Sequence, residues 1–180
     1  MAEEKTVDDV TSQTNTDSEI DEQKELFEKK SAQELFDMGN LEFKENKNYE
    51  VAADRFSMAV EKKVKELNVQ DNSIHVDLKE YYLCFADALL TKEEEKNDLF
   101  EFLKKKKKIE ASDTDESPDK EEISDEQLAF EMFEFARKCY ELYLENEKDL
   151  SIKDALNYSY VFIRLGDINL LNHFFDEALK

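Results

Sequence analysis

The sequence predicts an all-α protein built from repeated helical hairpins. Two glycines, one proline and no tryptophan disfavour a turn-rich β protein, and the chain is rich in residues that form helices. In addition, a pattern of large, x, x, large, small residues occurs three times, over residues 35–39, 82–86 and 162–166. Recurrence of one pattern at several places in a chain is typical of helical repeats.

The first repeat is expected over residues 31–67, as two helices joined by a turn at residues 47–48. Gly39 falls inside the first helix, where glycine costs about 1 kcal/mol relative to alanine. We therefore expect it to permit a close crossing of the two helices. The face of the second helix that packs on the first is predicted from an Ala, x3, Phe, x2, Ala spacing, formed by Ala52, Phe56 and Ala59.

The second repeat is expected over residues 77–146, interrupted by an insertion at residues 92–123. In repeat one, 13 residues separate Gly39 of the first helix from Ala52 of the second. In repeat two, 43 residues separate the matching positions, Ala86 and Ala129. A third, incomplete repeat is expected over residues 151–180. Because stacked repeats need caps at their ends, we expect either a truncated chain or an atypical end.

The charge of the chain points to a basic partner. Forty-six acidic residues against twenty-five basic residues give a formal net charge of -21, which repels nucleic acid and anionic membranes. Residues 1–20 are acidic and poor in apolar residues, so a flexible acidic tail is expected there. The alternative, that acidity only aids solubility, stays open at this point.

These spacings resemble the tetratricopeptide (TPR) motif, and the interrupted second hairpin resembles the interrupted-TPR histone chaperones, the nuclear autoantigenic sperm protein (NASP) family. The resemblance lies in residues 31–180, within a TPR domain set at 21–180. It implies binding of core histones three and four first and of linker histone second, without ATP, metal or other cofactor. It also implies a nuclear protein that shuttles to the cytoplasm, supports nucleosome assembly and is able to form a homodimer, with neither nucleic acid nor membrane as a direct partner.

In TPR stacks the first helix of each hairpin lines a concave groove, and this position predicts the histone-binding residues. Apolar side chains with interspersed carboxylates suit an amphipathic helix that carries Lys and Arg. For any single apolar position, packing between repeats is an equal alternative. The groove residues are Phe36, Asn40, Phe43, Glu80, Leu83, Asp87, Tyr160, Ile163 and Asp167.

A cluster of carboxylates at the end of the insertion is expected to shield basic histone surface and to compete with DNA for it. Lys104 to Lys108 form either a nuclear import signal or the basic end of a helix. The acidic residues of this segment are Glu110, Asp113, Asp115, Glu116, Asp119, Glu121, Glu122, Asp125 and Glu126.

No catalytic pattern is evident, so an enzyme is not expected. Cys84 and Cys139 lie in apolar helical patterns without a CxxC motif, and we interpret them as buried thiols of an intracellular protein. His75 precedes a helix start and is interpreted as a surface or capping residue, as is His173. The alternative to a histone chaperone is a generic TPR scaffold that joins non-histone proteins.

Overall fold

The computed structural model describes residues 27–70, 74–96, 124–146 and 149–171. The chain divides into two units, residues 1–31 and 32–180. In the first unit only residues 27–31 are described, as a short helical end and a turn in which the amide of Lys30 donates to the carbonyl of Phe27 at 3.2 Å. Everything that follows concerns the second unit.

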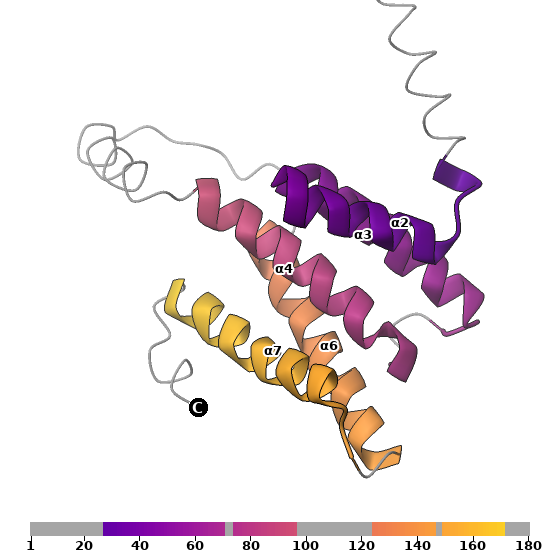
Figure 1. The fold of residues 1–180 in the computed structure, drawn as a ribbon. Helices are drawn as coiled ribbons and strands as arrows, with labels where there is room; N and C mark the ends of the chain where they lie inside the picture. Colours follow the sequence, from indigo (N-terminus) through magenta and orange to yellow (C-terminus); the bar gives the residue numbers. More distant parts are fainter. Residues whose placement is uncertain (1–26, 71–73, 97–123, 147–148, 172–180) are drawn as a thin grey trace, which may run out of the picture. The chain divides into compact units, whose positions relative to one another are not determined.

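The second unit is all-α in its described part, as the sequence predicts (Figure 1). The first hairpin consists of α2 (Ala32–Leu41), a π-helical turn η1 (Glu42–Asn46) and α3 (Tyr49–Glu66). A 3-10 turn η2 (Val76–Leu78) leads into α4 (Lys79–Lys96), and α6 (Asp125–Asn146) and α7 (Ile152–Leu171) follow. No described helix is both long enough and apolar enough to cross a bilayer.

The turn of the first hairpin lies at the predicted place. Lys47 adopts the left-handed conformation at φ 52°, and its amide donates to the carbonyl of Glu42, which closes the π turn. The amide of Asn48 donates to the same carbonyl at 3.0 Å. The side chain of Asn48 then accepts from the amide of Val51 at 3.3 Å and so caps α3. These bonds satisfy backbone groups at both helix ends.

Close approach of α2 and α3 depends on a small residue, as expected for Gly39. A β-carbon at this position would lie 2.7 Å from two ring carbons of Phe56. The three residues of the predicted packing face are buried, with Ala52 0%, Phe56 1% and Ala59 0% exposed. The crossing therefore explains why a helix-weakening glycine is kept there.

Helices α4 and α6 pack together although residues 97–123 separate them in the chain. The rings of Tyr82 and Phe135 stack at 5.4 Å, and Lys92 forms an ion pair with Asp125 at 2.6 Å. Because 82 faces 135 and 92 faces 125, the two helices are antiparallel. The Ala, x3, Phe, x2, Ala spacing of the first hairpin occurs again in α6, and its three residues Ala129, Phe133 and Ala136 are fully buried.

Helix α7 completes the described core by packing on α6 and on α4 (Figure 1). Val161 and Ile168 of α7 are buried, and the ring of Tyr158 lies 5.6 Å from that of Tyr140 in α6. Ser151 caps the start of α7: its Oγ accepts from the amide of Asp154 at 3.0 Å and donates to the Asp154 carboxylate at 2.6 Å.

Candidate partner-binding surface

Three carboxylates on one side of α4 are spaced by seven residues, which places them in a line along the helix. We call Glu80, Asp87 and Glu94 the α4 acidic row. Each of them contacts a basic residue of α7, Glu80 through Lys153 and the other two through Arg164. The row therefore lies between α4 and α7, and it pairs acids of one helix with bases of the other.

Arg164 is the centre of these contacts, with a side chain only 9% exposed. Its Nε donates to Asp87 at 2.9 Å, and its two terminal nitrogens donate to Glu94 at 2.8 and 3.1 Å. The remaining donors reach Asp167 at 3.2 Å and the hydroxyl of Thr91 at 3.2 Å. All five N–H donors of the guanidinium are thus used, which removes most of the cost of burying it.

The carboxyl of Asp87 is the most confined acid of the row. Its Oδ1 accepts from Arg164 and also from the hydroxyl of Tyr160 at 2.9 Å. Burial raises the pKa of this carboxyl, and the charge of Arg164 and the Tyr160 hydrogen bond offset that effect only in part. Burial likewise raises the pKa of the Tyr160 hydroxyl, so this hydroxyl stays protonated and donates to the carboxylate.

The contact between Lys153 and Glu80 is of a different kind because it is open to water. The ammonium lies 2.7 and 2.8 Å from the two carboxylate oxygens, while the Lys153 side chain is 69% exposed and that of Glu80 is 31% exposed. The hydrogen bond to Glu80 raises the pKa of Lys153. A pair of this type is weak, at about 0 to 1 kcal/mol.

One side of α7 exposes large apolar residues at helical spacing. Five of them form what we call the α7 apolar stripe, with exposures from 37% to 83%. Isolated exposed apolar residues are ordinary on protein surfaces, but a continuous row along one helix face is typical of a surface that binds a partner. The stripe consists of Ile152, Leu156, Tyr160, Ile163 and Leu170.

The apolar groove positions predicted from α2 and α4 have a structural role instead. Phe36 is 9% exposed and its ring lies 4.6 Å from that of Tyr81 in α4, so it fills the contact between the first two repeats. Leu83 is also buried, at 5%. For Phe36 the structure supports the alternative of packing between repeats, because Tyr81 of the second repeat covers its ring. Leu83 is likewise not open to a partner, because it is buried.

The polar and peripheral groove positions lie as follows. Asn40 donates its side-chain amide to the carbonyl of Phe36 at 3.1 Å, and Phe43 meets Tyr49 edge-on at 5.2 Å. Glu80 and Asp87 do not stand unpaired in a groove, because Lys153 and Arg164 neutralise them. In α7, Ile163 is 60% exposed, and Tyr160 and Asp167 lie on the same side of the helix.

Most of the predicted acidic segment lies outside the described residues. Asp125 and Glu126 are described, at the start of α6, and Asp125 is paired with Lys92. Its position at the helix N-terminus and its ion pair give Asp125 a stabilising role at the hairpin. Residues 110–122, residues 104–108 and His173 fall in the parts of the chain that the structure does not describe.

The thiols and His75 are placed much as the sequence suggests. Burial raises the pKa of Cys84 to about 12 and that of Cys139 to about 11. Both cysteines are free, with Cys139 buried and Cys84 half-buried. His75 caps η2, because its Nδ1 accepts from the amide of Asp77 at 3.2 Å.

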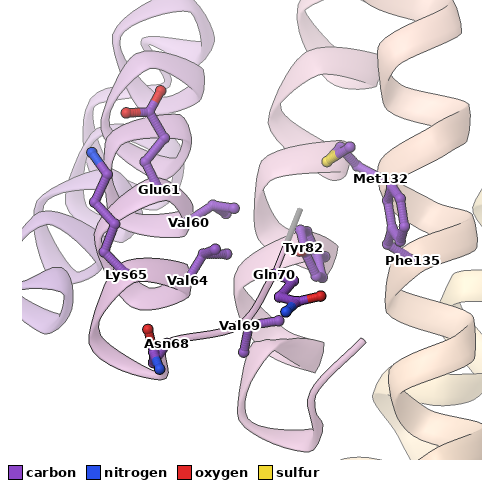
Figure 2. Close-up of a pocket in the computed structure, with 10 residues that line it drawn as sticks. All are labelled: Val60, Glu61, Val64, Lys65, Asn68, Val69, Gln70, Tyr82, Met132 and Phe135. Carbon is purple, nitrogen blue, oxygen red and sulfur yellow. The ribbon is translucent and has the colours of Figure 1, made fainter. Parts of the chain in front are cut away.

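A pocket of about 660 Å³ is lined by α3 and the segment that follows it, by α4 and by α6 (Figure 2). Val60 and Val64 of α3 face Tyr82, Met132 and Phe135 across it. Sequence reasoning did not predict this pocket, because its walls combine α3 and the segment that follows it with α4 and with the more distant α6.

Sequence reasoning also did not predict that Lys153, Thr91 and Glu94 join the polar contacts of α7. The spacing of Glu80, Asp87 and Glu94 was the available signal, since three acids at intervals of seven lie on one helix face. The identity of their partners carries no such signal, because Lys153 and Arg164 are about seventy positions further along the chain.

Comparison with known proteins adds one finding. A family model described as SHNi-TPR matches residues 159–180, which begin inside α7, seven residues after its start at Ile152. This is a TPR-type repeat. The SHNi-TPR class includes proteins of the NASP type. No curated protein and no solved structure matches the chain. Together with the antiparallel hairpins, the match shows a TPR-type helical repeat with a role in protein interaction.

Proposed function

We propose that this chain is an ATP-independent histone chaperone that binds core histones three and four and supports nucleosome assembly. The single observation that carries the proposal is the SHNi-TPR match in a chain whose second hairpin encloses a charged insertion. The helices on both sides of residues 97–123 pack against each other, so the insertion interrupts one hairpin and does not separate two domains. This arrangement is the one that the NASP resemblance requires.

The α7 apolar stripe supplies the surface for the apolar side of a histone helix. Ile152, Leu156 and Ile163 are 83%, 66% and 60% exposed, and together they offer a continuous contact for an amphipathic helix. Selectivity in this proposal comes from that contact, since apolar burial depends on shape and length in a way that exposed charges do not.

Charge supplies the second part of the mechanism. A net charge of -21 draws basic proteins to the chain and raises their encounter rate roughly 10- to 1000-fold. The carboxylates of residues 110–122 then neutralise histone lysines and arginines that would otherwise meet DNA. Such a protein acts where histones and DNA are assembled, so we place it in the nucleus, with shuttling to the cytoplasm, and assign it no catalytic step.

The proposal is tested by mixing the protein with purified core histones three and four and with DNA at physiological salt. A chaperone keeps the histones soluble and transfers them to DNA, whereas histone and DNA that still aggregate would contradict the proposal. A variant with Leu156→Ser and Ile163→Ser should bind histones about tenfold more weakly, since two exposed apolar contacts are lost. Leu41→Ser is the matched control, because Leu41 is 53% exposed on α2, away from the stripe.

The second candidate is a TPR scaffold for non-histone proteins, and the pairing within the α4 acidic row favours it. With Glu80 and Asp87 already neutralised, the described surface of α7 is more apolar than acidic, and it suits a partner without basic residues. Under this alternative the stripe variant loses binding to that partner, while histones and DNA aggregate in the presence of the native protein.

A further inference from the structure

The α4 acidic row holds two contacts of very different strength. At Asp87 and Glu94 the partner is Arg164, which is buried and uses all its donors. At Glu80 the partner is Lys153, which is mostly exposed and reaches α4 through this carboxylate. The first contact holds α7 to α4, whereas the second can exchange with solvent without moving the helix.

The chemistry of the two cations agrees with this division. A guanidinium presents a rigid set of donors that fits several acceptors at once, so its removal disrupts the contact. An ammonium sits on a flexible four-carbon stem and is strongly hydrated, so it leaves a carboxylate easily. Any second ammonium or guanidinium that reaches Glu80 can therefore take the place of Lys153.

The surroundings of Glu80 show which kind of ligand would compete. Lys153 stands in α7 between Ile152 and Leu156, which are 83% and 66% exposed. A ligand lying along the apolar stripe therefore passes next to the Lys153–Glu80 pair. A basic residue of that ligand that lies beside the pair can reach the carboxylate of Glu80, but Lys153 already occupies it.

We propose that Lys153 is an internal competitor that occupies Glu80 until a basic partner bound on the α7 apolar stripe displaces it. This inference rests on the proposed function, because it takes the partner to be a basic amphipathic helix. Lys153 lowers the affinity of the protein for cations that bind by charge alone, because such cations make no apolar contact that would offset the loss of the Lys153–Glu80 pair. A partner that also covers Ile152 and Leu156 gains apolar contact and overcomes the competition. Lys153 thus adds selectivity against unspecific polycations.

The test is a titration of the full chain with the complex of core histones three and four at about 0.1 M ionic strength. Lys153→Met keeps the length of the side chain and removes its charge, and it should bind about two- to fivefold more tightly, which is the range of one exposed ion pair. Lys138→Met is the matched control. Lys138 is exposed on α6, where its ammonium lies over the ring of Phe135, and its loss changes the net charge equally.

A double variant distinguishes the effect of breaking the Lys153–Glu80 pair from the effect of changing the net charge of the protein. In Lys153→Met with Glu80→Gln the gain in affinity should disappear, because the liberated carboxylate is gone, while Glu80→Gln alone should change affinity little. Lys153→Gln should repeat the result of Lys153→Met. Circular dichroism of each variant should match that of the native protein, because Lys153 is exposed and Glu80 is only partly covered.

The possible results point in different directions. An equal gain in Lys138→Met, or no gain in Lys153→Met while the native protein binds histones, overturns the inference and leaves the proposed function intact. If neither the native protein nor any variant binds histones, the proposed function is wrong, and the inference is wrong with it. A gain confined to Lys153→Met and cancelled by Glu80→Gln supports both.

Discussion

Gly39 in α2 lies against the ring of Phe56 in α3, so closely that an added β-carbon would stand 2.7 Å from the ring. Phe56 is 1% exposed and its ring lies 5.4 Å from that of Phe36, which in turn packs on Tyr81 of the next repeat. The ring therefore has no free space to move into. The first hairpin and its contact with the second repeat depend on this small residue.

We predict that Gly39→Ala lowers the free energy of unfolding by about 1 to 3 kcal/mol, the usual range for overpacking a core. The effect runs against helix propensity, which favours alanine by about 1 kcal/mol. Chemical denaturation of the purified variant measures the difference. Adding Phe56→Leu should recover part of the loss through coupling between the two sites. If Gly39→Ala instead raises the free energy of unfolding, α2 and α3 can move apart to admit the β-carbon without loss of stability.

The second prediction concerns Arg164, which holds α7 to α4. Arg164→Lys keeps the charge but cannot serve Asp87, Glu94, Asp167 and Thr91 together, so we expect a loss of about 3 kcal/mol in the stability of α7. Hydrogen exchange of the α7 amides measures this loss of stability. The protection of the amides in α2 and α3 against exchange should change least.

Arg137 provides the control for that experiment. It also pairs with two acids, Glu134 and Glu141, but both lie on its own helix and the side chain is 26% exposed. Arg137→Lys should therefore cost less than about 1 kcal/mol. Equal losses in the two variants would mean that burial and contact between helices do not distinguish Arg164.

The third prediction is a pH dependence that comes from Asp87. Its folded-state pKa is raised, chiefly by burial, so the folded protein binds this proton more tightly than the unfolded chain does. The contribution of Asp87 to stability is then fully present below the ordinary pKa of about 3.9. It is lost as pH rises through the higher folded-state value.

The comparison with Asp87→Asn isolates this effect, because asparagine keeps an oxygen acceptor for Arg164 and Tyr160 but does not titrate in this range. Relative to the variant, the native protein should lose stability as pH rises from about 3 to 6. Urea unfolding at several pH values measures the difference. If the native protein instead becomes more stable relative to Asp87→Asn as pH rises over this range, the ion pair with Arg164 outweighs the cost of burying Asp87.

Local features of this fold could be predicted from the sequence. The turn at residues 47–48, the close crossing at Gly39 and the buried face of Ala129, Phe133 and Ala136 all follow from spacing within one hairpin. The cap that Ser151 forms on α7 is equally local, because it joins residues three positions apart. Such features depend on residues that lie within a few turns of each other, where backbone geometry sets which side chains meet.

The surface could be predicted only in part. Of the predicted groove residues, Ile163 is exposed on α7, whereas Phe36 and Leu83 fill contacts between helices and Glu80 and Asp87 are paired. A helical pattern shows which residues share a face, but it does not show what will cover that face. That depends on how neighbouring hairpins are rotated against one another, which the chain pattern does not encode locally.

By itself the sequence determined the class of the fold, the first hairpin and its turn, and the strong negative charge, since these follow from composition and short-range periodicity. Only the tertiary structure decided that Arg164 and Lys153 of α7 neutralise the acids of α4, and that α7 carries an exposed apolar stripe. The physical reason is distance along the chain: these partners are 70 to 77 residues apart, and only packing of whole helices brings them within hydrogen-bond range.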